Sequence, residues 1–174
     1  MYIRTAEADD LDMISAVEAE CFPPAEAATR AEFEERLKYY KDCFWLMFDG
    51  DRLIAFLDGF VTDEPDLTDE MYARADMHNE NGRWQMIFGV NTLPEYRGRG
   101  YAGELINRAI SDARAAGRSG VVLTCKRGLL EYYARFGFVS EGPSEKSRHG
   151  GAEWYQMRLA FPLRTGEKDK RDGV

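Results

Sequence analysis

The sequence predicts an α+β domain with a mixed, mostly antiparallel sheet of about seven strands, flanked by about four helices. Residues 84–90 and 120–125 are short runs rich in aromatic and β-branched side chains, which is typical of strands. Between them, apolar residues recur at three- and four-residue spacing over residues 102–116, which predicts an amphipathic helix. A strand, a helix and a strand in this order predict one parallel pair. Residues 44–61 carry two strand-like runs around an Asp-Gly-Asp turn and predict an antiparallel hairpin.

The remaining elements are predicted from caps, prolines and glycines. Residues 2–6 form a first strand, and a helix follows it. Two prolines within residues 21–29 end that helix, and Thr29 with Glu32 caps the next one, which runs to about Tyr40. Three elements complete the chain. A helix at residues 129–137 ends at a glycine, and strands follow at residues 138–141 and 154–161.

The composition indicates one ordered domain. The chain has 174 residues, of which 44% are hydrophobic, and we place the domain at residues 1–162, followed by a charged tail at 163–174 that we expect to be disordered. A net charge of −8 argues against nucleic acid as a partner. No run approaches the ~20 apolar residues of a membrane span, and the first residues lack a signal-peptide pattern. We therefore expect a cytoplasmic monomer or homodimer that binds no membrane.

The cysteines and histidines do not predict a metal centre. Cys21, Cys43 and Cys125 include no closely spaced pair, which fits a reducing compartment. The two histidines, His78 and His149, are far apart in the sequence, so no cluster has the spacing of metal ligands. Each falls in a polar segment, where a surface position is the commoner outcome.

A glycine-rich turn follows the strand at residues 84–90. Gly98, Gly100 and Gly103 leave the main chain without side chains where the helix begins, and amide groups at a helix start attract anions. Arg97 and Arg99 add positive charge. The spacing also matches the dinucleotide fingerprint, but seven residues separate the strand from the turn and no acidic residue follows the next strand, so the context argues against that alternative.

Read as Arg97-x-x-Gly100-x-Ala102, the turn resembles the pyrophosphate loop of the GNAT N-acyltransferase superfamily. The order of elements and the segment Tyr-Tyr-Ala-Arg-Phe-Gly-Phe at residues 132–138 extend this resemblance over about residues 2–161. The loop Cys-Phe-Pro-Pro-Ala-Glu-Ala-Ala at residues 21–28 and the long spacing before Arg97 are most similar to the arylalkylamine, or serotonin-type, N-acetyltransferase branch.

The resemblance implies a GNAT fold in which the parallel strands splay apart at an acetyl-CoA site. In such a site main-chain N–H groups stabilise the charge that forms on the thioester oxygen, and a tyrosine, here Tyr133, protonates the departing sulfur. The positions that the resemblance assigns to coenzyme A are Phe88, Gly89, Val90, Arg97, Gly98, Arg99, Gly100, Tyr101, Ala102 and Gly103.

The chain departs from the animal enzymes of that branch at the proton relay. Where those enzymes carry two histidines, this sequence has Trp84 and Met86, neither of which accepts a proton. Glu26, His78 and Glu153 are therefore candidate bases, and a water chain or an amine that arrives neutral is the alternative. An apolar slot for the acceptor is predicted from Phe22, Pro23, Pro24 and Trp84, with Trp154 as a further candidate, although aromatic residues in this number usually pack the core.

Residues 63–81 are strongly acidic, with seven carboxylates against one arginine. Such a run is usually a solvated face, and the alternative is a flexible acidic lid that attracts a cationic amine. We expect an acetyl-CoA-dependent N-acetyltransferase that acts by direct transfer on a small primary amine, arylalkylamine or polyamine-like. Acetylation of a peptide or an aminoglycoside, or acyl-CoA binding without chemistry, are the alternatives.

Overall fold

The computed structural model describes residues 1–163 and forms nine strands and five α-helices over that range. The strands are β1 (Tyr2–Thr5), β2 (Phe44–Asp49), β3 (Arg52–Asp58), β4 (Val61–Thr62), β5 (Trp84–Ile87), β6 (Gly89–Thr92), β7 (Gly120–Cys125), β8 (Val139–Pro143) and β9 (Tyr155–Ala160). The α-helices are α1 (Leu11–Cys21), α2 (Arg30–Tyr40), α3 (Asp69–Ala73), α4 (Tyr101–Ala115) and α5 (Leu130–Ala134). Short 3₁₀ helices occupy Ala8–Asp10, Lys41–Cys43, Ala75–Met77, Pro94–Tyr96, Arg127–Leu129 and His149–Gly151.

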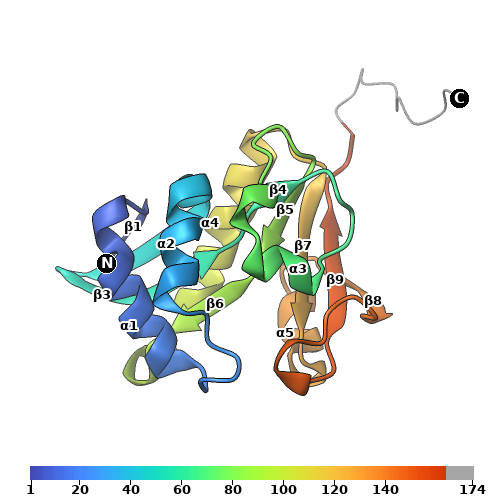
Figure 1. The fold of residues 1–174 in the computed structure, drawn as a ribbon. Helices are drawn as coiled ribbons and strands as arrows, with labels where there is room; N and C mark the ends of the chain where they lie inside the picture. Colours follow the sequence, from blue (N-terminus) through green and yellow to red (C-terminus); the bar gives the residue numbers. More distant parts are fainter. Residues whose placement is uncertain (164–174) are drawn as a thin grey trace, which may run out of the picture.

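The strands form two sheets that lie side by side (Figure 1). The first has the order β1-β2-β3-β6, and all its pairs are antiparallel. The second has the order β4-β5-β7-β9-β8, in which only β5 and β7 are parallel, with Trp84 opposite Gly120 and Ile87 opposite Leu123. The predicted parallel pair, the hairpin of β2 and β3, and the α+β class are thereby confirmed.

The division into two sheets differs from the single sheet of about seven strands that the sequence suggested. The chain crosses from one sheet to the other at three places: between β3 and β4, between β5 and β6, and between β6 and β7. At the first crossing, a Cβ on Gly59 would lie 1.8 Å from the carbonyl oxygen of Met86, so only glycine permits this approach. The hairpin strand predicted to reach Val61 therefore ends at Asp58, and Val61 pairs with Gln85 in the other sheet.

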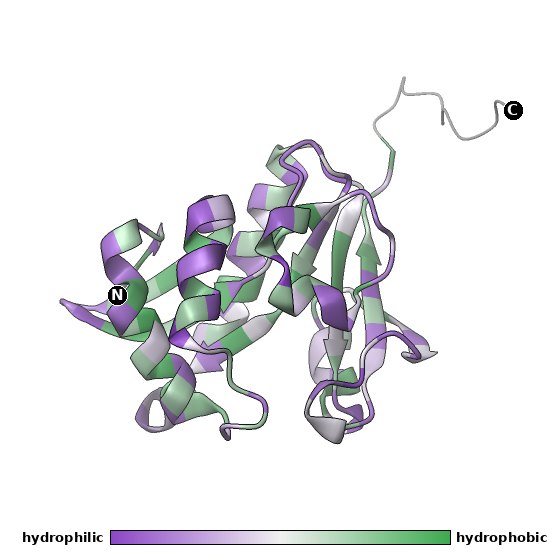
Figure 2. Ribbon diagram, in the orientation of Figure 1, coloured by the Kyte–Doolittle hydropathy of each residue, from purple (hydrophilic) through white to green (hydrophobic). Residues whose placement is uncertain are grey.

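Helices cover both faces of the sheets and enclose two apolar cores. The core beneath α1 and α2 includes Ile14, Phe33 and Phe56, while the core beneath α4 includes Ile106 and Ile110 (Figure 1). Figure 2 shows the same division, with hydrophobic residues along the strands and hydrophilic residues on the outer sides of the helices. The predicted capping box at the start of α2 is present, since Thr29 accepts from the Glu32 amide and Glu32 accepts from the Thr29 amide.

The acidic segment at 63–81 is folded against the body of the protein. Leu67 and Met71 are completely or almost completely buried in the core beneath α2, and Met71 is the buried residue of α3. The carboxylates at 63, 64, 70, 76 and 80 are exposed, as a solvated face requires, but neither sequence-based interpretation included an apolar side that packs into the core. Of the predicted tail, residues 164–174 lie outside the described residues, and no helix within residues 1–163 is long and apolar enough to cross a bilayer.

Candidate active site

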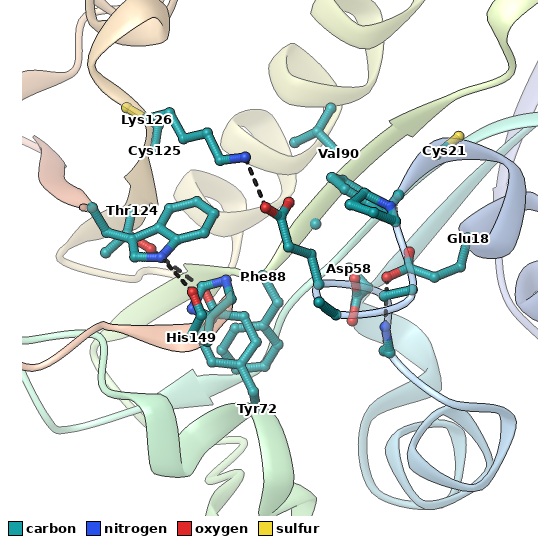
Figure 3. Close-up of a pocket in the computed structure, with 18 of the residues that line it drawn as sticks. Glu18, Cys21, Asp58, Tyr72, Phe88, Val90, Thr124, Cys125, Lys126 and His149 are labelled. Carbon is teal, nitrogen blue, oxygen red and sulfur yellow. Dashed lines mark hydrogen bonds and ion pairs between the residues drawn. The ribbon is translucent and has the colours of Figure 1, made fainter. Parts of the chain in front are cut away.

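A cavity of about 530 Å³ opens where the two sheets separate. The pairing of β5 with β7 stops at Ile87 and Leu123, and β6 then pairs with β3 instead. This leaves Gly89 and Val90 on one side of the cavity and Thr124 and Cys125 on the other (Figure 3). The splayed strands that the resemblance implied are present at the predicted residues.

The outer edge of β6 offers unpaired main-chain groups to this cavity. The Leu93 amide bonds to the Ile54 carbonyl, and in an antiparallel ladder the bonding groups of successive residues point to opposite sides. Val90 and Thr92 therefore face away from β3. The Thr92 carbonyl accordingly accepts hydrogen bonds from Arg97 Nε and Cys21 Sγ, and the Val90 N–H lies on the same outer edge of β6.

The glycine-rich turn brings a run of main-chain amides to the start of α4. Gly98 and Gly100 have φ angles of 76° and 86°, in the left-handed region that favours glycine, and Gly100 is the N-cap of the helix. Among residues 1–163, no acceptor bonds to the amides from Gly98 to Gly103. Free amides at the start of a 15-residue helix form an anion site, and this arrangement fits the diphosphate of coenzyme A.

The two arginines of the turn bond to main-chain carbonyls that precede the loop. Arg97 is held by the Thr92 carbonyl at 3.0 Å, and the Arg99 guanidinium bonds to the Glu95 carbonyl at 3.2 Å and stacks over Tyr96. Both side chains are exposed and have no carboxylate partner among the described residues. They therefore add uncompensated positive charge to the loop.

The loop between α1 and α2 forms one wall of the cavity. Phe22 and Pro23 line the cavity, as does Glu26, whereas the exposed Pro24 does not. Glu26 accepts a hydrogen bond from Lys126 Nζ at 2.9 Å, so an ion pair crosses from this loop to the end of β7 (Figure 3). The loop also touches the turn at His149–Gly151, because a Cβ on Gly150 would lie 2.9 Å from Glu26 Cγ.

Tyr133 lines the cavity from α5, where its ring packs against Phe138 and Tyr132. Its hydroxyl has no hydrogen-bond partner in the described part of the chain. Burial raises the pKa of the Tyr133 phenol above its ordinary value. The group therefore stays protonated at neutral pH, as a proton donor must.

Cys125 lies near Tyr133 but is not suited to act as a nucleophile. Burial raises the pKa of its thiol to about 11, and its sulfur contacts the sulfur of Met157 at 3.6 Å. The thiol is protonated at neutral pH, in agreement with its interpretation as packing at the end of a strand.

Two predicted site residues lie elsewhere. Trp84 does not line the cavity: its ring packs beside Gly120, and the Arg158 guanidinium lies 4.5 Å from the ring centroid. His78 is half-buried against Tyr40 and Phe60, and its Nδ1 accepts from the Val61 amide at 3.1 Å. The predicted positions of Trp84 and His78 in the site were therefore wrong. Trp84 packs opposite a glycine, and His78 packs beside aromatic rings.

Of three further cavity residues, Tyr72 was not singled out from the sequence, His149 was assigned to the surface, and Trp154 was named only as a possible contact of the acceptor. Tyr72 comes from the acidic segment, and its hydroxyl lies 3.4 Å from Thr124 Oγ1. His149 and Trp154 come from the loop before β9, with their rings stacked at 4.1 Å. No local sequence pattern marks these residues as neighbours, because Tyr72 meets His149 and Trp154 only after segments about 80 residues apart have packed together.

The charged groups along the cavity are mostly carboxylates. Four of them, Glu18, Glu26, Glu32 and Asp58, line it together with two cations, Arg36 and Lys126. Asp58 is buried against Arg36, with an N–O distance of 2.9 Å, and burial raises its pKa while the guanidinium opposes the rise. Among the described residues, no group of three or more histidine, cysteine or acidic side chains could hold a metal ion.

Comparison with known proteins assigns this architecture to a family. Residues 11–138 match the acetyltransferase (GNAT) family, and the chain therefore belongs to it and is an acyltransferase. This matched region contains β6, the glycine-rich turn, β7 and α5, which together build the cofactor side of the cavity.

Solved structures show the same fold at low sequence identity. The GphF GNAT-like decarboxylase in complex with isobutyryl-CoA is 18% identical, with a TM-score of 0.76 over 92% of this chain and 99% of that one. The loading GNATL domain of CurA from Lyngbya majuscula is 16% identical, with a TM-score of 0.77 over 91% and 96%. A GNAT acetyltransferase from Brucella melitensis in complex with acetyl-CoA is 20% identical, with a TM-score of 0.60 over 93% and 88%.

Proposed function

We propose that this protein transfers an acetyl group directly from acetyl-CoA to a small primary amine, with an arylalkylamine or a polyamine as the acceptor. The observation that carries the proposal is a cavity lined by Val90, on the outer edge of β6, and by the protonated Tyr133, with the free amides at 98–103 following β6 along the chain. The Val90 N–H stabilises negative charge on the thioester oxygen, and the Tyr133 hydroxyl donates a proton to the departing sulfur.

The cavity wall supports a small and cationic acceptor. Carboxylates outnumber cations along the lining, which favours an ammonium group on its approach. Tyr72, Phe88 and Trp154 supply an apolar, aromatic surface for the rest of the molecule. The Glu26–Lys126 ion pair and the contact between Glu26 and Gly150 join the two walls, which leaves less room for a folded protein substrate than for a free amine.

A thiol-release assay with acetyl-CoA and a panel of acceptors tests the proposal. The panel contains arylalkylamines, polyamines, an aminoglycoside and peptides with free N-termini. We expect turnover with small amines, and a fall in kcat on the order of 10²-fold in Tyr133→Phe with unchanged CoA affinity, since only a proton donor is lost. Turnover with peptides alone would assign a peptide acetyltransferase, and tight CoA binding without thiol release would assign a binding module.

A further inference from the structure

His149 lies in the cavity wall, with its ring held between aromatic neighbours. The ring stacks on Trp154 at 4.1 Å and 17°, and the Tyr72 ring lies 4.5 Å away, tilted by 45° (Figure 3). The Trp154 indole N–H donates to the His149 carbonyl at 2.9 Å. A histidine held in this way has a defined orientation toward the cavity, unlike one on a solvated loop.

Asp69, at the start of α3, fixes the turn that carries His149. Its carboxylate accepts from the backbone amides of Arg148 at 2.8 Å and His149 at 3.3 Å. The same carboxylate lies 3.4 Å from His149 Nδ1, a buried nitrogen without a hydrogen bond of normal geometry. A small rotation of the ring brings Nδ1–H to this carboxylate and leaves Nε2 as the acceptor. Nε2 has no hydrogen-bond partner within residues 1–163.

We propose that His149 is the general base that takes the proton of the acceptor amine, and that Asp69 is the positioning residue that orients it. The inference rests on the acyl transfer proposed above and deepens it. It gives the acidic segment at 63–81 a role, since α3 supplies both Asp69 and Tyr72.

The other proton acceptors of the cavity are already engaged. Glu26 is held by Lys126 at 2.9 Å, and Asp58 is held by Arg36 at the same distance. Glu18 accepts hydrogen bonds at both oxygens, from the Ala28 amide and the Asn91 side chain, and Glu32 accepts from the Thr29 amide at 2.6 Å. Among the described residues lining the cavity, His149 is the base with a free acceptor nitrogen.

The reaction then balances with residues of this chain. The amine nitrogen forms a bond to the acetyl carbon while the carbon–sulfur bond breaks, and the electron pair of that bond leaves on sulfur. His149 Nε2 takes the proton from the amine, and the Tyr133 hydroxyl gives a proton to the sulfur. Proton exchange through solvent afterwards returns both residues to their starting states.

The pH dependence of this base has a defined sign. Burial lowers the pKa of His149 below its ordinary value, while Asp69 and Glu26 act to raise it and Lys126 acts to lower it. Tyr72, on the other ring face, stays neutral because burial raises its pKa to about 12. The imidazole is therefore neutral at pH 7, and kcat/KM rises with pH through a limb below pH 6.5 and is level above it.

Three variants of His149 and Asp69 test the proposal in the thiol-release assay. His149→Phe keeps the aromatic stack without a base, and His149→Ala leaves space for added imidazole. We expect kcat to fall on the order of 10²-fold in both, with unchanged CoA affinity, and imidazole to restore activity in His149→Ala only. Asp69→Asn keeps one acceptor for the turn, lowers kcat and moves the acidic limb to lower pH, because it removes a charge that raises the pKa of His149.

The outcomes separate this inference from the proposed function. Activity of His149→Phe within twofold of the wild type, or an acidic limb that persists in that variant, overturns the role of His149 and leaves acyl transfer intact. Absence of turnover by the wild-type protein across the amine panel overturns the proposed function, and this role with it. His78→Gln serves as the matched control, since that histidine is half-buried among aromatic rings but lies outside the cavity.

Discussion

Arg36 and Asp58 lie side by side in the lining of the cavity, with 4% and 1% of their side chains exposed. Arg36 also donates to the Tyr72 carbonyl at 3.0 Å, so this one side chain joins α2, β3 and α3. A buried ion pair is costly to form but far more costly to break on one side, because the remaining charge then has no partner and no water.

Arg36→Leu should therefore destabilise the protein by about 3–5 kcal/mol, as measured by urea unfolding. The double variant Arg36→Leu/Asp58→Leu should recover much of that loss, since it leaves no buried charge. Equal free energies of unfolding for the single and double variants would show that the uncompensated carboxylate is not the cause.

At the residue scale, the sequence identified the groups that carry local motifs and missed those that depend on packing. Gly100 was predicted at a helix start because a glycine turn before a helix is a local pattern, and it is the N-cap of α4; Tyr133 was singled out through its resemblance to a family segment, and it lines the cavity. His149 was assigned to the surface because nothing near it in the sequence indicates Tyr72 or Asp69, which approach it only in the folded chain.

At the element scale, the start of α4 is the part of the site that the sequence predicted most completely. The spacing of glycines and apolar residues fixed the turn, the helix and its C-terminal glycine, Gly117, without knowledge of the sheets. Gly100 and Gly117 both have positive φ, and a Cβ on either one would meet no atom within 4 Å. The two glycines therefore have equal space around them, and they differ only in that Gly100 begins the helix and Gly117 follows its end.

This pair provides a matched test of the anion site. Gly100→Ala and Gly117→Ala should each lower the free energy of unfolding by about 1–2 kcal/mol, the strain of a left-handed alanine. Only Gly100→Ala should also weaken CoA binding, by about tenfold, because it shifts the amides of the turn. The comparison uses calorimetric titration with CoA, and an equal loss of affinity in both variants contradicts the assigned site.

The acidic segment shows where an element was misjudged. Its carboxylates dominated the interpretation, although Leu67, Met71 and Ala75 occur at the four-residue spacing of a buried helical side and pack into the core. The charged residues lie on the outer side of the segment and the apolar residues on the inner side. The count of carboxylates therefore gave information about the outer side alone.

Met71→Ala tests whether this segment belongs to the core. Removal of a buried methionine side chain should cost about 2–5 kcal/mol in thermal or denaturant unfolding, through lost burial and a cavity. Asp76→Ala, at an exposed position of the same segment, should change stability by less than about 0.5 kcal/mol. Similar small effects of the two variants would indicate a segment that moves independently of the core.

At the scale of the whole molecule, the candidate site depends on the division of the strands into two sheets. The sequence indicated the strands and the parallel pair, and the family resemblance implied that the pair splays apart, but the division into two sheets was not predicted because residues 84–90 read as one continuous strand. The break at Phe88 and the close contact of Gly59 with Met86 depend on partners distant in the chain. The division creates both the open edge at Val90 and the cavity beside it.

A crystal structure with bound acetyl-CoA tests this account most directly. It should show the diphosphate against the amides of residues 98–103, the pantetheine arm between β6 and β7, and the thioester oxygen within hydrogen-bonding distance of the Val90 N–H. The account is contradicted if the cofactor lies outside the gap between β6 and β7, or if its carbonyl oxygen meets no main-chain amide of β6.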